Sequence, residues 1–128
     1  MAEMEVILRD IFALQSVVLT TGREGCIAEL ELREPSVESH GRWLTLECPG
    51  WHIHLDAERV GRVGYHEAPD PHPGPPGRTS RSFRVLDASG EPLFKVFLTG
   101  VYDNEGRELP GRTDAYEALK TRHSLPAL

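Results

Sequence analysis

The sequence has few cysteines, few aromatic side chains and no long apolar run. Of its 128 residues only Cys26 and Cys48 are cysteines, and 7% are aromatic. Two isolated cysteines without a C-x-x-C spacing favour reduced core residues over a disulfide or a metal site. No segment approaches the roughly 20 consecutive apolar residues that a membrane-spanning helix requires.

Motifs of several functional classes are also missing. The chain contains no P-loop and no G-x-G-x-x-G, so it has no nucleotide-binding fingerprint. Ser80 and Ser82 lie outside any G-x-S-x-G context, and neither cysteine lies in a nucleophile motif, so acyl transfer is unsupported. The net charge of −6 argues against non-specific binding to nucleic acid or to an anionic membrane. Residues 1–5 are acidic and do not begin a signal peptide, so we expect a bacterial-type cytoplasmic protein.

Length and composition are those of one globular domain. Hydrophobic residues make up 39% of the chain and charged residues 27%. A chain of this length can bury about two-thirds of its unfolded surface, which is enough for one core. We therefore expect a single domain over residues 1–128.

The clearest structural signal is a β-hairpin over residues 79–98. Two β-rich runs flank the polar stretch D-A-S-G-E, in which Gly90 can adopt the positive φ that closes a short loop. In the second run Phe94, Val96 and Leu98 share one face and Leu93, Lys95 and Phe97 the other. This run is apolar on both faces apart from Lys95, which predicts a central strand.

The rest of the chain predicts helices at both ends and further strands between them. Apolar spacing predicts a helix over 5–15 and a second over 114–122 capped by Thr113. Alternation and β-branched residues predict strands at 16–20, 26–32 (half-buried), 43–46, 51–55 and 60–66. Gly61 and Gly64 suggest a close approach of another group to the last of these strands. Residues 68–77 predict a mobile Pro-rich surface loop and residues 123–128 a frayed tail. The predicted elements together give an α+β fold, a large curved antiparallel sheet of about seven strands with a helix at each end.

Candidate chemistry is densest in W-H-I-H-L at residues 51–55. On a strand His52 and His54 share a face, where two imidazoles can bind a metal ion or ligate haem iron. The alternative is two solvated residues on an outer face. With Glu58 the pair also suggests a non-haem metal site, and His66 at the end of the next strand can face the same cavity.

Arginines cluster at the start of the hairpin. Arg78, Arg81 and Arg84, together with arginines at positions 59 and 62, can form an anion-binding patch, since guanidinium groups grip carboxylates in a bidentate way. The alternative is ordinary surface arginines that balance twenty acidic residues.

Four motifs together resemble one repeat of the HemS/ChuX haem-utilisation family. They are G-C-I at 25–27, G-R-W-L at 41–44, W-H-I-H-L at 51–55 and V-L-D-A-S-G-E-P-L-F-K-V-F at 85–97, and the resemblance extends over about residues 6–122. It implies a curved antiparallel sheet, haem as ligand and, for single-repeat members, a homodimer. The sequence departs from the family pattern at three positions: Leu30 stands where the pattern has a ligating histidine, Glu67 where it is basic, and Gly64 where a tryptophan is common.

The sequence thus leads to three functional hypotheses. The first is non-enzymatic haem binding and intracellular haem trafficking or utilisation, with His54 as the iron ligand, His52 and His66 as substitutes, and Arg81 or Arg84 near the propionates. The second is a dimeric small-ligand or interaction scaffold without haem, which Leu30 and Glu67 motivate. The third is a non-haem metal protein that uses His52, His54 and Glu58.

Overall fold

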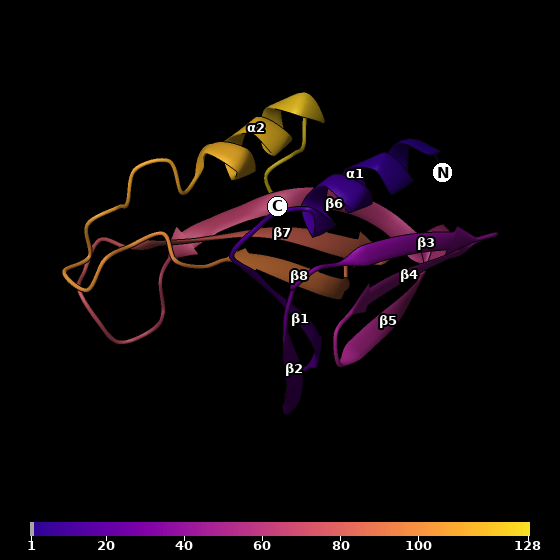
Figure 1. The fold of residues 1–128 in the computed structure, drawn as a ribbon, viewed down its shortest axis with the longest axis horizontal. Coiled ribbons are helices and arrows are strands. Elements are labelled where there is room, and N and C mark those ends of the chain that lie inside the picture. The colour runs from indigo at the N-terminus through magenta and orange to yellow at the C-terminus, as the bar shows by residue number, and fades with distance from the viewer. Residues whose placement is uncertain (1) are drawn as a thin grey trace.

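Two helices, eight strands and one short 3-10 helix make up the computed structural model, which describes residues 2–128 (Figure 1). In chain order the elements are α1 (Ala2–Phe12), β1 (Val17–Arg23), β2 (Cys26–Glu31), β3 (Ser36–His40), β4 (Trp43–Cys48), β5 (Trp51–Asp56), η1 (Ala57–Arg59), β6 (Val60–Pro69), β7 (Thr79–Asp87), β8 (Pro92–Leu98) and α2 (Asp114–Arg122). Within residues 2–128 no helix has the length and apolar character needed to cross a membrane.

The strands form two antiparallel sheets. One sheet has the order β2-β1-β8-β7-β6, and the other has the order β3-β4-β5. The α+β class and the antiparallel arrangement are confirmed, with eight strands divided between two sheets where the sequence predicted about seven in one.

The hairpin forms as predicted from β7 and β8. Phe83 pairs with Val96 and Val85 with Phe94, and β8 is a central strand between β1 and β7. In the turn, Asp87 Oδ1 accepts hydrogen bonds from the main-chain N–H groups of Ser89 at 2.9 Å and Glu91 at 3.0 Å. Gly90 has a φ of 91°, a conformation that costs glycine little.

Both helices cover the same side of the five-stranded sheet (Figure 1), which we call its helix-facing side. Phe12 of α1 stacks on Phe94 with ring centroids 5.7 Å apart, and Tyr116 of α2 lies 4.8 Å from Phe83. Because side chains alternate along a strand, the residues between these core positions point to the opposite side, which we call the outer face. On β7 and β8 the outer face carries Ser82, Arg84, Lys95 and Phe97.

Several element boundaries differ from the predictions. Helix α1 spans Ala2–Phe12 and not 5–15, and β3 was not predicted. Strand β2 is an exposed edge strand and not a half-buried one, so Ile27 is 64% exposed. Cys26, expected in the core, is exposed, whereas Cys48 is buried. Thr113 precedes α2 as predicted, but its side chain makes no capping bond.

The Pro-rich segment is held by hydrogen bonds around one side chain. Pro69 still belongs to β6, and Asp70 N–H bonds to Arg78 O at 2.9 Å to close the loop. The Arg78 guanidinium donates to the main-chain oxygens of Pro75 at 2.8 Å and His72 at 2.9 Å. The main-chain carbonyl groups of Pro75 and His72 therefore have a hydrogen-bond donor inside the loop.

The C-terminal residues do not fray as expected, because they dock on strand β6. Tyr65 N–H donates to Pro126 O at 2.9 Å, and Leu128 N–H donates to Tyr65 O at 2.8 Å, with a parallel bridge between Tyr65 and Ala127. The predicted close approach at Gly64 is confirmed. A Cβ at this position would collide with Pro126 O and lie 2.6 Å from Leu128 Cγ.

Candidate functional site

The histidine pair on β5 has the predicted orientation but is exposed. His52 and His54 lie on the same face, their ring centroids 5.1 Å apart, and both side chains are exposed. His54 Nδ1 lies 2.9 Å from Thr45 Oγ1 on the neighbouring strand. The apolar residues that alternate with them, Trp51 and Ile53, pack against the core on the other face.

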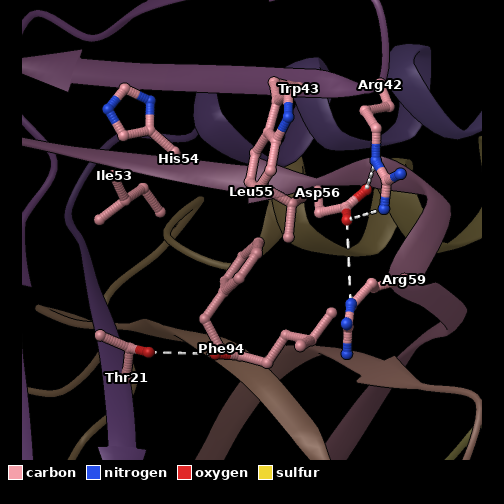
Figure 2. A pocket seen from close by; sticks show the side chains of 10 residues that line it. Thr21, Arg42, Trp43, Ile53, His54, Leu55, Asp56, Arg59 and Phe94 are labelled. Carbon is pink, nitrogen blue, oxygen red and sulfur yellow. Dashed lines mark hydrogen bonds and ion pairs between the residues drawn. The ribbon is translucent and has the colours of Figure 1, made fainter.

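A cavity of about 750 Å³ lies next to this strand (Figure 2). Ile53 and Leu55 point into it, whereas the ring of His54 lies on the other side of the strand at the rim. The charged groups that line the cavity neutralise one another, because the Arg42 guanidinium forms a forked ion pair with Asp56. The Arg42 bonds hold the pKa of Asp56 below its usual value, and the same bonds raise the pKa of Arg42. The cavity thus offers neither an imidazole in its interior nor an unpaired cation.

The third hypothesis, a metal site of His52, His54 and Glu58, is not supported. Glu58 forms an ion pair with Arg42 at 3.1 Å. Among residues 2–128, no group of three or more histidine, cysteine or acidic side chains is placed to hold a metal ion.

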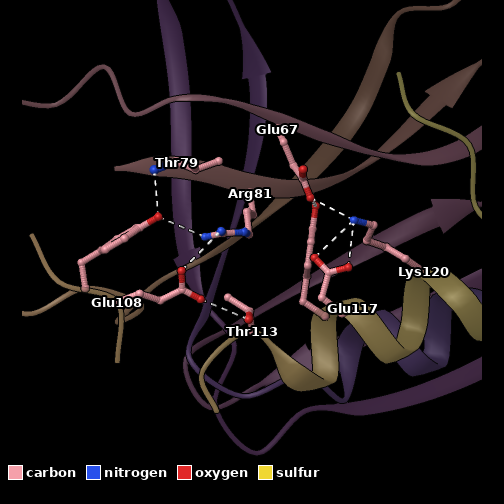
Figure 3. Close-up of polar contacts among 9 residues, drawn as sticks. Glu67, Thr79, Arg81, Glu108, Thr113, Glu117 and Lys120 are labelled. Carbon is pink, nitrogen blue, oxygen red and sulfur yellow. Dashed lines mark hydrogen bonds and ion pairs between the residues drawn. The ribbon is translucent and has the colours of Figure 1, made fainter. Parts of the chain in front are cut away.

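Arg81 lies on the helix-facing side of the sheet, within a satisfied polar network (Figure 3). Its guanidinium donates to the Tyr102 hydroxyl at 3.3 Å and lies 3.8 Å from the Glu108 carboxylate. Burial opposes the charged form, but the Tyr102 bond and the nearby carboxylates raise the pKa of Arg81. Arg81 is therefore already neutralised within the fold.

Glu67 belongs to the same side of the sheet. Its carboxylate accepts hydrogen bonds from Lys120 at 3.0 Å and from the Tyr116 hydroxyl at 3.2 Å, and the bond to Lys120 holds its pKa below the usual value (Figure 3). The acid that replaces a basic residue of the family pattern thus anchors α2 to β6. Leu30 pairs with Leu19 on this side and packs against the core.

The outer face carries two neighbouring cations without a counterion. Arg84 and Lys95 are directly opposite each other on β7 and β8, and neither forms an ion pair within residues 2–128. Glu29, the acidic residue of the same cross-strand row, is two strands from Lys95, or about 10 Å. Burial lowers the pKa of both groups, and the charge of Arg84 lowers that of Lys95 further.

One atom of this pair is unsatisfied. Arg84 Nε is buried and has no hydrogen-bond partner. A buried donor without a partner costs about 1–3 kcal/mol, and two like charges directly opposite on neighbouring strands also destabilise a sheet. An anion that accepts from Nε and lies between the two cations would remove both costs.

An open cavity of about 570 Å³ lies over the outer face beside Lys95. Phe97, Val18 and Ile27 contribute apolar surface to it, and segment 70–72 of the Pro-rich loop also lines it. The carboxylates of Glu29 and Asp70 are part of the lining, whereas Arg84 and His66 lie outside it. The apolar part of this surface, with Lys95 and the adjacent Arg84, suits a flat apolar ligand with negative groups at one edge.

His66 lies on the outer face, two residues from the position opposite Arg84. It pairs with Ser82 on β7, so its diagonal distance to Arg84 is about 7–8 Å between Cα atoms. His66 Nδ1 lies 2.8 Å from the main-chain oxygen of Leu128. That oxygen can only accept, so Nδ1 carries the proton, and the lone pair of the neutral ring is on Nε2.

The structure thus brings together two of the five predicted site residues. His66 and Arg84 share the outer face, whereas His52 and His54 are on β5 and Arg81 is on the helix-facing side. Lys95 was not among the predicted site residues. Its signal was present in the sequence, since it is the single charged residue of an otherwise apolar strand.

Comparisons with known proteins agree with this fold. A protein-family model matches residues 5–122, nearly the whole chain. Two solved structures of ChuX, one of them described as a haem-binding protein, superpose with TM-scores of 0.75 and 0.72. In both, 16% of residues are identical, and the match covers 96% and 94% of this chain and 73% and 72% of ChuX.

Longer proteins contain the same architecture. The haem-binding protein PhuS from Pseudomonas aeruginosa matches with a TM-score of 0.62 at 16% identity, over 98% of this chain and 32% of PhuS. ChuS, an E. coli haem oxygenase, matches with a TM-score of 0.64 at 15% identity, over 92% of this chain and 34% of ChuS. This chain thus spans about a third of each. No curated protein sequence matches it.

Proposed function

Since the chain belongs to the HemS/ChuX-like family, we propose that it binds haem, on the outer face of its five-stranded sheet. The observation that carries the proposal is the buried, unpartnered Arg84 Nε beside the unneutralised Lys95. Haem is a flat apolar ring with two carboxylates at one edge, and these two cations lie at the border of an apolar sheet surface.

Each surface of the proposed site has a distinct role. Arg84 and Lys95 pair with the propionates, which supplies the missing acceptor for Nε and relieves the repulsion between the two cations. Phe97, in the same cross-strand row as Ser82 and His66, takes part of the apolar ring out of water. The neutral imidazole of His66 presents Nε2 as the iron ligand.

The residues of the outer face can hold haem with His66 as the only ligating histidine. The family's ligand position holds Leu30 here, on the opposite side of the sheet, so an iron ligand has to come from another element. His66 meets the usual requirement for a ligating histidine, because its second nitrogen already donates to a main-chain oxygen. Bound haem would supply an iron centre, and the chain itself would hold and orient it. We propose a cytoplasmic haem carrier that is not an enzyme.

Titration with haemin, followed at the Soret band, tests this proposal. We expect a shifted band at micromolar protein, a weaker and spectrally altered complex for His66→Ala, and no change for His54→Ala, the matched histidine on an exposed strand face. The absence of any shift contradicts haem binding. If the spectrum is unchanged in His66→Ala and changed in His54→Ala, the iron ligand is His54 on β5 and not His66.

One observation favours a second function, a dimeric scaffold without haem. Ile27 is 64% exposed on β2, and no other strand covers the outer edge of β2 within residues 2–128. An uncovered edge strand with an exposed apolar residue can pair with a second copy of the chain. Light scattering that reports a monomer at high concentration would exclude it.

A further inference from the structure

The segment 126–128 lies next to His66, the proposed iron ligand, and is held in place by hydrogen bonds to His66 and to β6. After α2 the chain reverses at Ser124, which has a φ of 47°, and Leu125 N–H bonds back to Lys120 O at 3.0 Å. The last residues then run parallel to β6 and exchange two hydrogen bonds with Tyr65. Their path ends with the Leu128 main-chain oxygen at His66 Nδ1.

A glycine makes room for this segment. Gly64 is buried and its φ lies outside the left-handed region, so the backbone conformation does not require glycine there. The space does require it, because an added Cβ would meet Pro126 O and the Leu128 side chain. Gly64 and His66 are two residues apart on the same face of β6, so the segment that covers Gly64 also reaches the ring of His66.

We infer that segment 126–128 is a positioning element for His66. This inference rests on the proposed function, since it concerns how the iron ligand is presented. By accepting a hydrogen bond from Nδ1–H, the Leu128 oxygen fixes both the tautomer and the plane of the ring, and leaves the lone pair of Nε2 free to bind the iron. Removal of such a partner of a ligating histidine typically lowers metal affinity by about 10–100-fold.

The first test needs no haem. In the haem-free protein, ¹⁵N chemical shifts of the His66 ring report which nitrogen carries the proton. We expect the Nδ1–H tautomer in the native chain and a mixture of tautomers in Gly64→Ala, in which the new methyl group displaces the segment but every side chain of the site is kept. An Nε2–H tautomer in the native chain overturns the inference.

The second test uses haemin. A chain that lacks residues 126–128, and Gly64→Ala as a full-length variant, should bind haemin about tenfold or more weakly and with an altered ligand-field spectrum. Ala127→Ser, an exposed change that keeps the main chain, should match the native protein. Native affinity and spectrum in both disrupted variants overturn the inference while the proposed function stands. Failure of the native chain to bind haemin contradicts the proposed function, and the tautomer measurement still decides whether the segment orients the ring.

Discussion

Arg84 and Lys95 lie directly opposite each other on two central strands, partly buried and without a carboxylate partner among residues 2–128. Most charged side chains of this protein are paired, as Arg42 is with Asp56 and Lys120 with Glu67. Other arginines without an ion pair within residues 2–128, such as Arg62, are exposed, whereas Arg84 and Lys95 are partly buried. The two residues therefore identify a partly buried place where the fold lacks negative charge. The first two predictions concern this pair.

Replacement of Arg84 by methionine should stabilise the haem-free protein and weaken the complex. Methionine fills similar space without the unsatisfied Nε and without repelling Lys95, so we expect the free energy of unfolding to rise by about 1 kcal/mol. Arg62→Met, at an exposed position on β6, is the matched control and should change stability by less than about 0.5 kcal/mol. Urea unfolding measures both, and a loss of stability in Arg84→Met would show that the guanidinium is satisfied in solution.

The two cations should distinguish a porphyrin with free carboxylates from its dimethyl ester. Each charge-assisted contact contributes about 1.5–3 kcal/mol, so we expect at least tenfold tighter binding of the dicarboxylate. In the double variant Arg84→Met, Lys95→Met the difference should disappear. Fluorescence titration with metal-free porphyrins measures this preference separately from iron ligation, and equal binding of acid and ester by the native chain would contradict the role of the pair.

Acid should weaken the contact between α2 and β6. The pKa of Glu67 is lowered in the folded state by Lys120, so its stabilising contribution is complete above the ordinary value of about 4.5 and is lost as the pH falls below it. The partners are partly exposed, so we expect less than about 1 kcal/mol. Glu67→Gln should lose stability at pH 7 and show a flatter decline between pH 5 and about pH 3. Parallel declines in thermal unfolding of the two proteins would assign the acid sensitivity to other carboxylates.

The hairpin turn should depend on one carboxylate. Asp87 Oδ1 accepts three hydrogen bonds, two from main-chain N–H groups and one from the Ser89 hydroxyl. Asp87→Ala should lower the free energy of unfolding by about 1–2 kcal/mol, since both N–H groups lose their partner. Ser89→Ala keeps the main-chain bonds and should lower the free energy of unfolding by less than half as much. Equal losses in the two variants would show that the bond from the Ser89 hydroxyl, and not the main-chain bonds, stabilises the turn.

The parts of the fold that the sequence predicted are those with local signals. The hairpin and α2 combine periodicity with turn residues within one segment, and both have the expected bounds. Strand β3 has a single apolar side chain, Val37, and depends on pairing with β4, so its own residues carry little signal. The exposure of β2 follows from its place at the sheet edge, which alternation alone does not encode.

Only part of the proposed site could be named from the sequence, because the residues that share a face depend on strand register. Arg84 and His66 were candidates by residue type, but only the pairing of β6, β7 and β8 puts them and Lys95 on one face, with Arg81 on the other. His54 was a candidate because His52 lies on the same face of the strand. The alternation of side chains that puts both histidines on one face also points both of them away from the core. Gly64 predicted a close approach, and no local signal indicated that its partner is the segment 126–128.

Segment 126–128 also limits how the protein can assemble. It occupies the middle of the free border of β6, while the border of β2 stays open. The N–H and C=O groups of Tyr65 are bonded to this segment, so another strand cannot pair with β6 at this point. The three residues that orient an imidazole thus also cover part of a sheet border, where unpaired main-chain groups would otherwise be open to a second chain.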